Sequence, residues 1–118
     1  MTDDTWTIGT YDGIEPDEPY PGVQRRAFDA RSATVTRYEF APSATFPLHR
    51  HSQEQVTIVH SGMVTMRIGE AECTLEAGAY SVIRGGVEHG ITAGPDGAQI
   101  TAIVVPRRER AGAYEVVR

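Results

Sequence analysis

Residues 46–55 read FPLHRHSQEQ, and they place two of the chain's four histidines one residue apart. Side chains alternate between the two faces of a β-strand. If one strand runs unbroken through this stretch, His49, His51 and Gln55 share a face and Glu54 points the other way. The two imidazoles then start about 6.6–6.8 Å apart at the backbone, which suits convergence on a single ion. Imidazole is the commonest protein ligand for transition metals, so the stretch predicts a metal site.

The chain around this stretch is a series of short segments rich in Val, Ile, Thr and Tyr, separated by Gly, Pro and Asx residues. No segment has both the length and the 3.6-residue period of a helix. Repeated short strands with such punctuation predict an all-β sandwich or barrel. The segments are SATVTRYEF (32–40), QVTIVHSG (55–62), MVTMRIG (63–69), AECTLE (71–76), AYSVI (79–83) and AQITAIVV (98–105).

The N-terminal part of the chain has a different texture. Residues 9–22 hold three prolines and three glycines among acidic residues, and no hydrophobic period runs through them. Such a composition predicts irregular structure. We therefore divide the chain into an N-terminal arm, residues 1–31, which is partly irregular, and a barrel, residues 32–118.

Length and composition limit the class of protein. The chain has 118 residues, 40% hydrophobic and 23% charged, which predicts one ordinary globular domain. The formal net charge of −5 argues against nucleic acid or an anionic membrane as a partner. We expect a cytoplasmic protein, because the N-terminus lacks a signal peptide pattern, no apolar run could span a membrane, and the single Cys73 has no partner for an internal disulfide. The absence of lysine excludes Schiff-base catalysis.

Two spaced motifs carry a resemblance to a known family. The pattern His49-x-His51-x3-Gln55-x6-Gly62 resembles the first conserved motif of the cupin superfamily, and Gly78-x5-Arg84-x-Gly86-x2-His89 resembles the second. Together they cover residues 43–93, and the strand-rich texture extends the resemblance to about residues 32–106. The resemblance implies an all-β cupin double-stranded β-helix, a jelly-roll barrel, with one metal ion in its mouth.

By position, the resemblance implies four metal ligands: His49, His51, Gln55 and His89. The sequence departs from the family pattern most at Gln55, where a glutamate is usual; Ser43, Arg84 and Ala93 replace a usual Gly, Pro and Asn. A glutamine offers a neutral carbonyl oxygen in place of a carboxylate. The ligand set is compatible with one divalent transition metal per chain, Mn, Fe, Co, Ni or Zn.

Three neutral imidazoles and a neutral amide leave a divalent ion its full charge, which favours Lewis-acid chemistry. We therefore expect an enzyme of the isomerase, lyase or cyclase type that acts on a small oxygenated organic substrate. Two alternatives stay open: a metal-dependent dioxygenase, and a non-catalytic small-molecule-binding or sensory cupin. The resemblance also implies a homodimer, in which the N-terminal arm pairs with the partner subunit and Trp6 and Ile8 anchor it.

Other residues of the site follow from strand alternation. On RYEF, either Arg37 and Glu39 or Thr36, Tyr38 and Phe40 face inward. Tyr38 is our candidate for proton transfer, because a phenol suits both an apolar wall and acid–base chemistry. Met66 and Tyr80 are candidates to line the substrate cavity. His60 has the wrong parity for a ligand.

Overall fold

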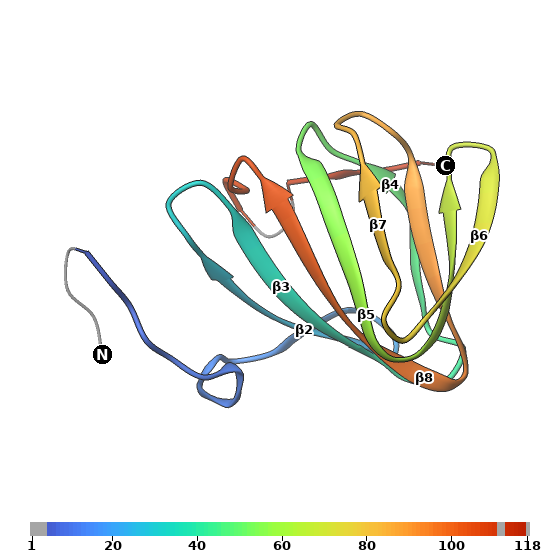
Figure 1. The fold of residues 1–118 in the computed structure, drawn as a ribbon, viewed down its shortest axis with the longest axis horizontal. Coiled ribbons are helices and arrows are strands. Elements are labelled where there is room, and N and C mark those ends of the chain that lie inside the picture. Colours follow the sequence, from blue (N-terminus) through green and yellow to red (C-terminus); the bar gives the residue numbers. More distant parts are fainter. Residues whose placement is uncertain (1–4, 111–112, 118) are drawn as a thin grey trace.

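The computed structural model describes residues 5–110 and 113–117. Their strands form one β-sheet that curls into a half-barrel (Figure 1). The predicted all-β fold is confirmed. One 3-10 turn, η1 (Tyr11–Gly13), precedes the strands. The strands are β1 (Asp17–Tyr20), β2 (Val23–Asp29), β3 (Thr34–Phe40), β4 (Thr45–Arg50), β5 (Glu54–Ile68), β6 (Ala71–Glu76), β7 (Tyr80–Ile83), β8 (His89–Val105) and β9 (Glu115–Val116). Across the described residues, no helix has the length and apolar character to cross a membrane.

Two long antiparallel strands, β5 and β8, organise the sheet. They pair with each other along almost their whole length, and every other strand attaches to one of them directly or through a neighbour. The first half of β8 pairs with β4 and its second half pairs with β3, so β8 links the two sides of the barrel. β5 pairs in addition with β6 and β7. The four chain segments that contribute to the site described below are therefore all tied to this central pair.

The sequence pattern around Gly62 predicts two separate strands, but the structure has one continuous strand, β5, with bulges on both sides of this glycine. Gly62 has a φ of 75°, and a Cβ there would lie 2.1 Å from the carbonyl oxygen of Gly97. Only glycine fits such a close approach without a shift of the backbone. The glycine therefore bends the strand and does not end it.

The interior face of the sheet is apolar. Val23, Val64 and Met66 are almost completely buried, and burial of such a side chain stabilises a fold by about 1.5–3 kcal/mol. Aromatic rings add to this interior: Tyr38 and Phe46 pack edge to face, with ring centroids 5.9 Å apart. The interior of the half-barrel is thus a packed apolar core.

The N-terminal arm is more regular than its composition predicts. β2 pairs with β3 over seven residues, and Val23 is fully buried in the core. β1 pairs only with β2, so it is an edge strand, where Pro19 is tolerated because no neighbour needs its missing N–H. Among residues 5–31, the regular sheet therefore begins at Asp17, and the longer irregular part of the described arm precedes it.

A candidate metal centre inside the barrel

Three histidines from different parts of the chain meet inside the barrel. His49 comes from the end of β4, His51 from the turn that follows, and His89 from the first position of β8. One ring nitrogen of each lies within 4.8 Å of those of the other two. The His49 and His89 ring centroids are 4.2 Å apart, and those of His51 and His89 are 4.9 Å apart. The sequence prediction that these three side chains converge is confirmed.

The route by which they converge differs from the prediction. β4 ends at Arg50 and β5 begins at Glu54, so His49 and Gln55 lie on two different strands. Alternation along a single strand therefore does not explain why Gln55 faces the histidines. Gln55 reaches the site because β5 lies beside β8, with its side chain on the interior face. The loop before β8 supports the turn: the Gly86 N–H donates to the His51 carbonyl oxygen at 2.8 Å.

Each histidine is held by a hydrogen bond to a backbone carbonyl. The Nδ1 atoms of His49, His51 and His89 lie 2.8, 3.0 and 2.9 Å from the carbonyl oxygens of Pro47, Gln53 and Val87. A carbonyl oxygen can only accept, so Nδ1 carries the proton in all three rings. In a neutral imidazole, Nε2 then presents its lone pair. This arrangement is the usual way in which proteins orient imidazoles toward a metal.

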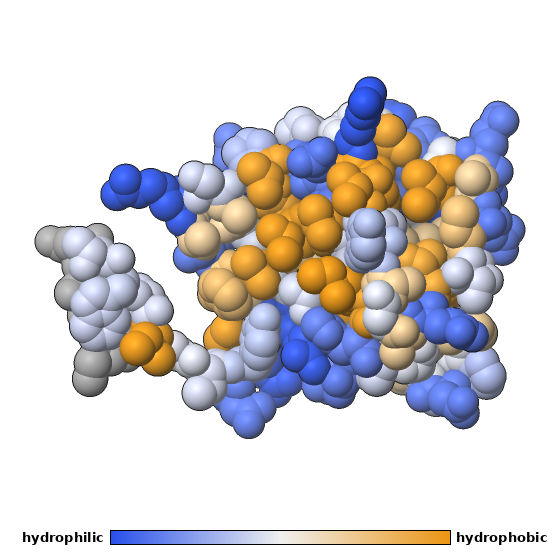
Figure 2. Space-filling model, viewed as in Figure 1, coloured by the Kyte–Doolittle hydropathy of each residue, from blue (hydrophilic) through white to orange (hydrophobic). Residues whose placement is uncertain are grey.

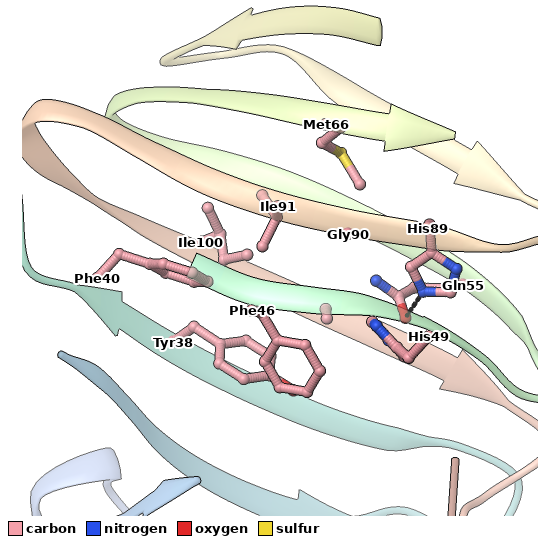
Figure 3. Close-up of a pocket in the computed structure, with 11 residues that line it drawn as sticks. Tyr38, Phe40, Phe46, His49, Gln55, Met66, His89, Gly90, Ile91 and Ile100 are labelled. Carbon is pink, nitrogen blue, oxygen red and sulfur yellow. Dashed lines mark hydrogen bonds between the residues drawn. The ribbon is translucent and has the colours of Figure 1, made fainter. Parts of the chain in front are cut away.

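Gln55 adds a fourth electron-pair donor to the same point (Figure 3). Its Oε1 lies 3.0 Å from His51 Nε2 and 3.3 Å from His89 Nε2. Its Nε2 donates to Thr57 Oγ1 at 3.0 Å, which fixes the amide with the oxygen toward the histidines. Three imidazole nitrogens and one amide oxygen thus face each other, so the donor set fits a divalent transition metal.

The protonation of the buried histidines agrees with this arrangement. Burial, and then the neighbouring His89, lower the pKa of His49 from 6.5 to about 3. Burial is also the main cause that lowers the pKa of His89. Both rings are therefore neutral at pH 7, and their Nε2 lone pairs are available to a metal ion.

A cavity of about 30 Å³ adjoins the cluster. This volume holds one or two water molecules, so a larger ligand has to occupy the open end of the barrel. The cavity is lined by Tyr38, Phe40, Phe46, His49, Gln55, Met66, His89, Gly90, Ile91, Ile100 and Ala102.

Two of the three residues predicted from sequence to line the site do lie at this cavity. Tyr38 is 8% exposed, and Thr36 and Phe40 share its inward face, which resolves the choice left open on RYEF. Met66 is buried against the same space. Tyr80 is not part of the site: it is 72% exposed on the outer face of β7. The alternation on β7 turns Ser81 inward instead, and its hydroxyl donates to the Met66 sulfur at 3.5 Å.

Sequence analysis missed an aromatic wall beside His49. The ring centroids of Phe46 and Tyr114 lie 4.6 and 5.2 Å from that of His49. Tyr114 arrives from the C-terminal segment, where β9 pairs with β4. Its hydroxyl lies 3.0 Å from that of Tyr20 on β1. No local pattern connects these residues to the HxH stretch, since they meet it only through the fold.

A second missed feature clamps the C-terminal segment to the site. Arg50, between the two motif histidines, donates to Glu115 at 2.9 Å and to Glu88 at 3.1 Å. The three side chains are exposed, so each pair contributes little to stability. Together they connect β9, β4 and the residue before His89 at the edge of the site.

Comparisons with known proteins agree with the fold. A family profile described as a cupin domain matches residues 36–106. KdgF from a Halomonas species is 20% identical, with a TM-score of 0.80 over 87% of this chain and 97% of that one. An RmlC-like cupin from Shewanella frigidimarina is 21% identical, with a TM-score of 0.78 over 91% and 95%.

Oxalate decarboxylase from Bacillus subtilis, which has Mn(II) centres, is 13% identical. Its TM-score is 0.84 over 95% of this chain, which spans 33% of the length of that protein. No curated protein matches the sequence. At these identities the solved structures establish the fold and not the reaction.

Proposed function

The chain belongs to the cupin domain family, and from that membership and the geometry of the histidine cluster we propose that it is a divalent-metal-dependent enzyme. We propose that His49, His51, Gln55 and His89 hold one metal ion and that the substrate is a small oxygenated organic molecule. The reaction would be a redox-neutral one of the isomerase, lyase or cyclase type. A cytoplasmic location stays a prediction.

One observation carries this proposal: four electron-pair donors face each other with no proton between them. The three Nδ1 atoms are engaged by carbonyl oxygens, and the Gln55 amide is fixed by Thr57. Lone pairs of neutral groups repel one another unless a cation or a hydrogen-bond donor lies among them. Two of the histidines are buried, and all four groups are neutral acceptors at this point, which is the donor set that a divalent transition metal takes.

The chain's own residues would supply the rest of the chemistry. A bound divalent ion would polarise a carbonyl or hydroxyl oxygen and lower the pKa of its water. Tyr38 stays our candidate for proton transfer, because its ring lines the cavity beside His49. Phe46 and Tyr114 exclude water on the other side of His49. The all-neutral ligand set is what favours Lewis-acid over oxygen chemistry.

Metal content is the first experiment. Elemental analysis of the purified protein should give about one metal ion per chain, and none in the His49→Ala/His51→Ala variant. His60→Ala is the matched control, because His60 is exposed on β5 and its ring is hydrogen-bonded to Thr101, away from the cluster. A wild-type protein that binds none of Mn, Fe, Co, Ni and Zn when they are added would overturn the proposal.

Turnover experiments separate the three functional readings. A dioxygenase consumes O₂ with its substrate, whereas a Lewis-acid enzyme converts its substrate under argon. A non-catalytic binding or sensory protein binds its ligand without converting it under either condition. A His51→Ala single variant should lose turnover but keep the fold if the protein is an enzyme.

We propose that the protein is a homodimer whose subunits meet through the outer face of the sheet. Strand register aligns five apolar residues in one row across five strands: Phe28, Val35, Ile103, Val56 and Val82. This face carries a broad apolar patch (Figure 2). A two-fold dimer places the same patch on both subunits, and an uncharged row is complementary to its own copy.

The arm belongs to the same proposal. A cleft of about 1190 Å³ lies between residues 5–14 and the end of β2, and Trp6, Ile8 and Phe28 are among its lining. Figure 1 shows the arm reaching away from the barrel. A segment of the second subunit fits this cleft, next to the apolar row. Removal of residues 1–10, which spares β1, should weaken the dimer.

A further inference from the structure

The interior of the barrel contains a charged residue that no part of the proposed metal chemistry uses. Arg25 on β2 is only 7% exposed. Its Nε and Nη2 donate to the Asp17 carboxylate at 2.8 and 2.9 Å. Burial disfavours its charge, but the bonds to Asp17 and the neighbouring Tyr38 phenol keep the pKa of Arg25 above its ordinary value. The guanidinium is therefore charged inside the barrel.

The third nitrogen of this guanidinium has no hydrogen bond of good geometry to the described residues, although the Tyr38 phenol is its neighbour across the strand pair. Arg25 Nη1 is buried and has no hydrogen-bond partner. A buried donor without a partner is costly, so such groups call for a ligand or an ordered water. Because Asp17 holds the other two nitrogens, the direction of Nη1 is fixed. The Nη1 group of Arg25 is thus a hydrogen-bond donor held in a fixed direction on the interior face.

A second arginine, Arg108, is held against the same inward face of β3. Arg108, after the end of β8, donates from Nη2 to Thr36 Oγ1 at 3.1 Å, while its buried Nε has no partner. Among residues 5–110 and 113–117, no carboxylate forms an ion pair with it.

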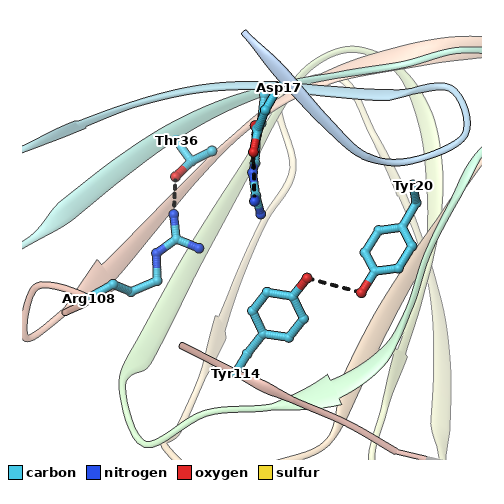
Figure 4. A network of polar contacts seen from close by, with 6 residues as sticks. Asp17, Tyr20, Thr36, Arg108 and Tyr114 are labelled. Atoms are coloured by element: carbon cyan, nitrogen blue, oxygen red, sulfur yellow. Dashed lines mark hydrogen bonds and ion pairs between the residues drawn. The ribbon is translucent and has the colours of Figure 1, made fainter. Parts of the chain in front are cut away.

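Strand register ties both arginines to the inward face of β3. Arg25 is paired with Tyr38, and Thr36, which binds Arg108, is two residues away on the same inward face. Two residues along a strand correspond to about 6.6–6.8 Å. Figure 4 shows Arg108, the Asp17 ion pair and the Tyr20–Tyr114 pair around the same end of the barrel interior.

The tyrosine pair adds a neutral donor. The Tyr20 and Tyr114 hydroxyls are 3.0 Å apart, and only one of their two protons is used between them. Burial, and then the hydrogen bond to Tyr114, raise the pKa of Tyr20 to about 12, so this phenol keeps its proton at pH 7. The remaining O–H of the pair can donate to a ligand.

From this arrangement we infer that the barrel mouth contains a carboxylate-binding subsite, formed by Arg25 Nη1, Arg108 Nε and the Tyr20–Tyr114 pair. The inference rests on the proposed function and names its substrate class: a small organic acid. Its carboxylate lies on the arginines, and a second oxygen of the same molecule points toward the histidine cluster. Two separate N–H donors match the two oxygens of one carboxylate.

The test compares acids with their neutral amides. Malonate, succinate and glutarate, and the corresponding diamides, are titrated calorimetrically into the zinc-loaded protein and into the chelator-stripped protein. Metal content is measured separately on each sample. We expect at least one acid to bind about tenfold or more tightly than its amide, because a charge-assisted hydrogen bond is lost in the amide.

Variants locate the binding. Arg108→Gln should lower the affinity for the tightest-binding acid by about tenfold or more, without a change in metal content. Arg107→Gln, which removes an exposed charge one residue away, should stay within about twofold of the wild type. Arg25→Lys tests Arg25 while it keeps the positive charge, because Arg25→Ala would leave Asp17 unpaired.

Failure of the subsite and failure of the metal proposal give different results. If metal binds but no acid exceeds its amide, or if Arg108→Gln and Arg107→Gln have equal effects, the subsite is overturned and the metal proposal stands. Acids that bind only through the metal lose their affinity on stripping and keep it in Arg108→Gln, which also overturns the subsite. If no metal binds but Arg108-dependent acid binding persists, the subsite stands alone.

Discussion

Gln55 Oε1 lies 3.0 Å from His51 Nε2, although the Nδ1 bond of this histidine leaves a lone pair on the facing nitrogen. Two electron-pair donors are thus held at the distance of a hydrogen bond. The contact is stabilising only if a cation or a hydrogen-bond donor bridges the two atoms. This relationship makes Gln55 the most informative residue of the site.

Replacement of Gln55 by Glu should tighten metal binding. The variant adds a formal negative charge beside three neutral imidazoles, and we expect the affinity for Mn²⁺ or Zn²⁺ to rise about tenfold or more, that is about 1.4 kcal/mol. Competition with a chromophoric chelator measures it. Glu54→Gln is the control, because Glu54 is exposed on the opposite face. An unchanged affinity in Gln55→Glu would remove residue 55 from the ligand set.

The stability of the metal-free protein should fall as the pH is lowered from 7 to 5. In the unfolded chain His49 binds a proton below pH 6.5, whereas in the fold its pKa is about 3, so protons favour the unfolded state throughout this interval. At about 1.4 kcal/mol per pH unit below 6.5, His49 alone lowers the free energy of unfolding by about 2 kcal/mol at pH 5.

Urea unfolding of chelator-treated protein at the two pH values measures this loss. His49→Gln lacks the titrating ring, so its stability should decline less over the same interval, by about the amount that His49 contributes. An equal decline in wild type and variant would show that His49 is not the group that binds the proton.

The bend of β5 can be tested with two glycines of similar backbone conformation. Gly62 and Gly69 have φ values of 75° and 58°, but only at Gly62 does an added Cβ meet the backbone. Gly69→Ala should cost about 1–2 kcal/mol, the conformational penalty alone. Gly62→Ala should cost more, because the sheet must also shift at Gly97. Thermal or urea unfolding of both variants compares them, and equal losses would argue against a steric role.

What the sequence predicts well and what it misses have a common physical reason. The clustering of His49, His51 and His89 could be predicted because their spacing is a property of two short motifs. The length of β5 could not, because a glycine that bends a strand and one that ends it look alike until the partner strand is known. Tyr114 reaches the site only because β9 pairs with β4, and Arg108 only because Thr34 and Thr36 bind it. Tyr80 faces outward because β7 has the opposite phase.

The dimer proposal predicts that a charge in the apolar row separates the subunits. Ile103 is at the centre of the row and points away from the metal cluster, so Ile103→Glu should place two carboxylates in the interface and yield monomers. Desolvation of unpaired charges would cost several kcal/mol. Thr74→Glu, an equal charge on exposed β6 outside the row, should stay dimeric.

Light scattering after size-exclusion chromatography gives the mass of each variant. Metal content serves as the internal check that the barrel is intact, because Ile103 does not line the cavity. A wild-type protein of 12.9 kDa in solution would refute the dimer outright. If Ile103→Glu remains dimeric while removal of residues 1–10 yields monomers, the arm and its cleft form the interface and the apolar row does not.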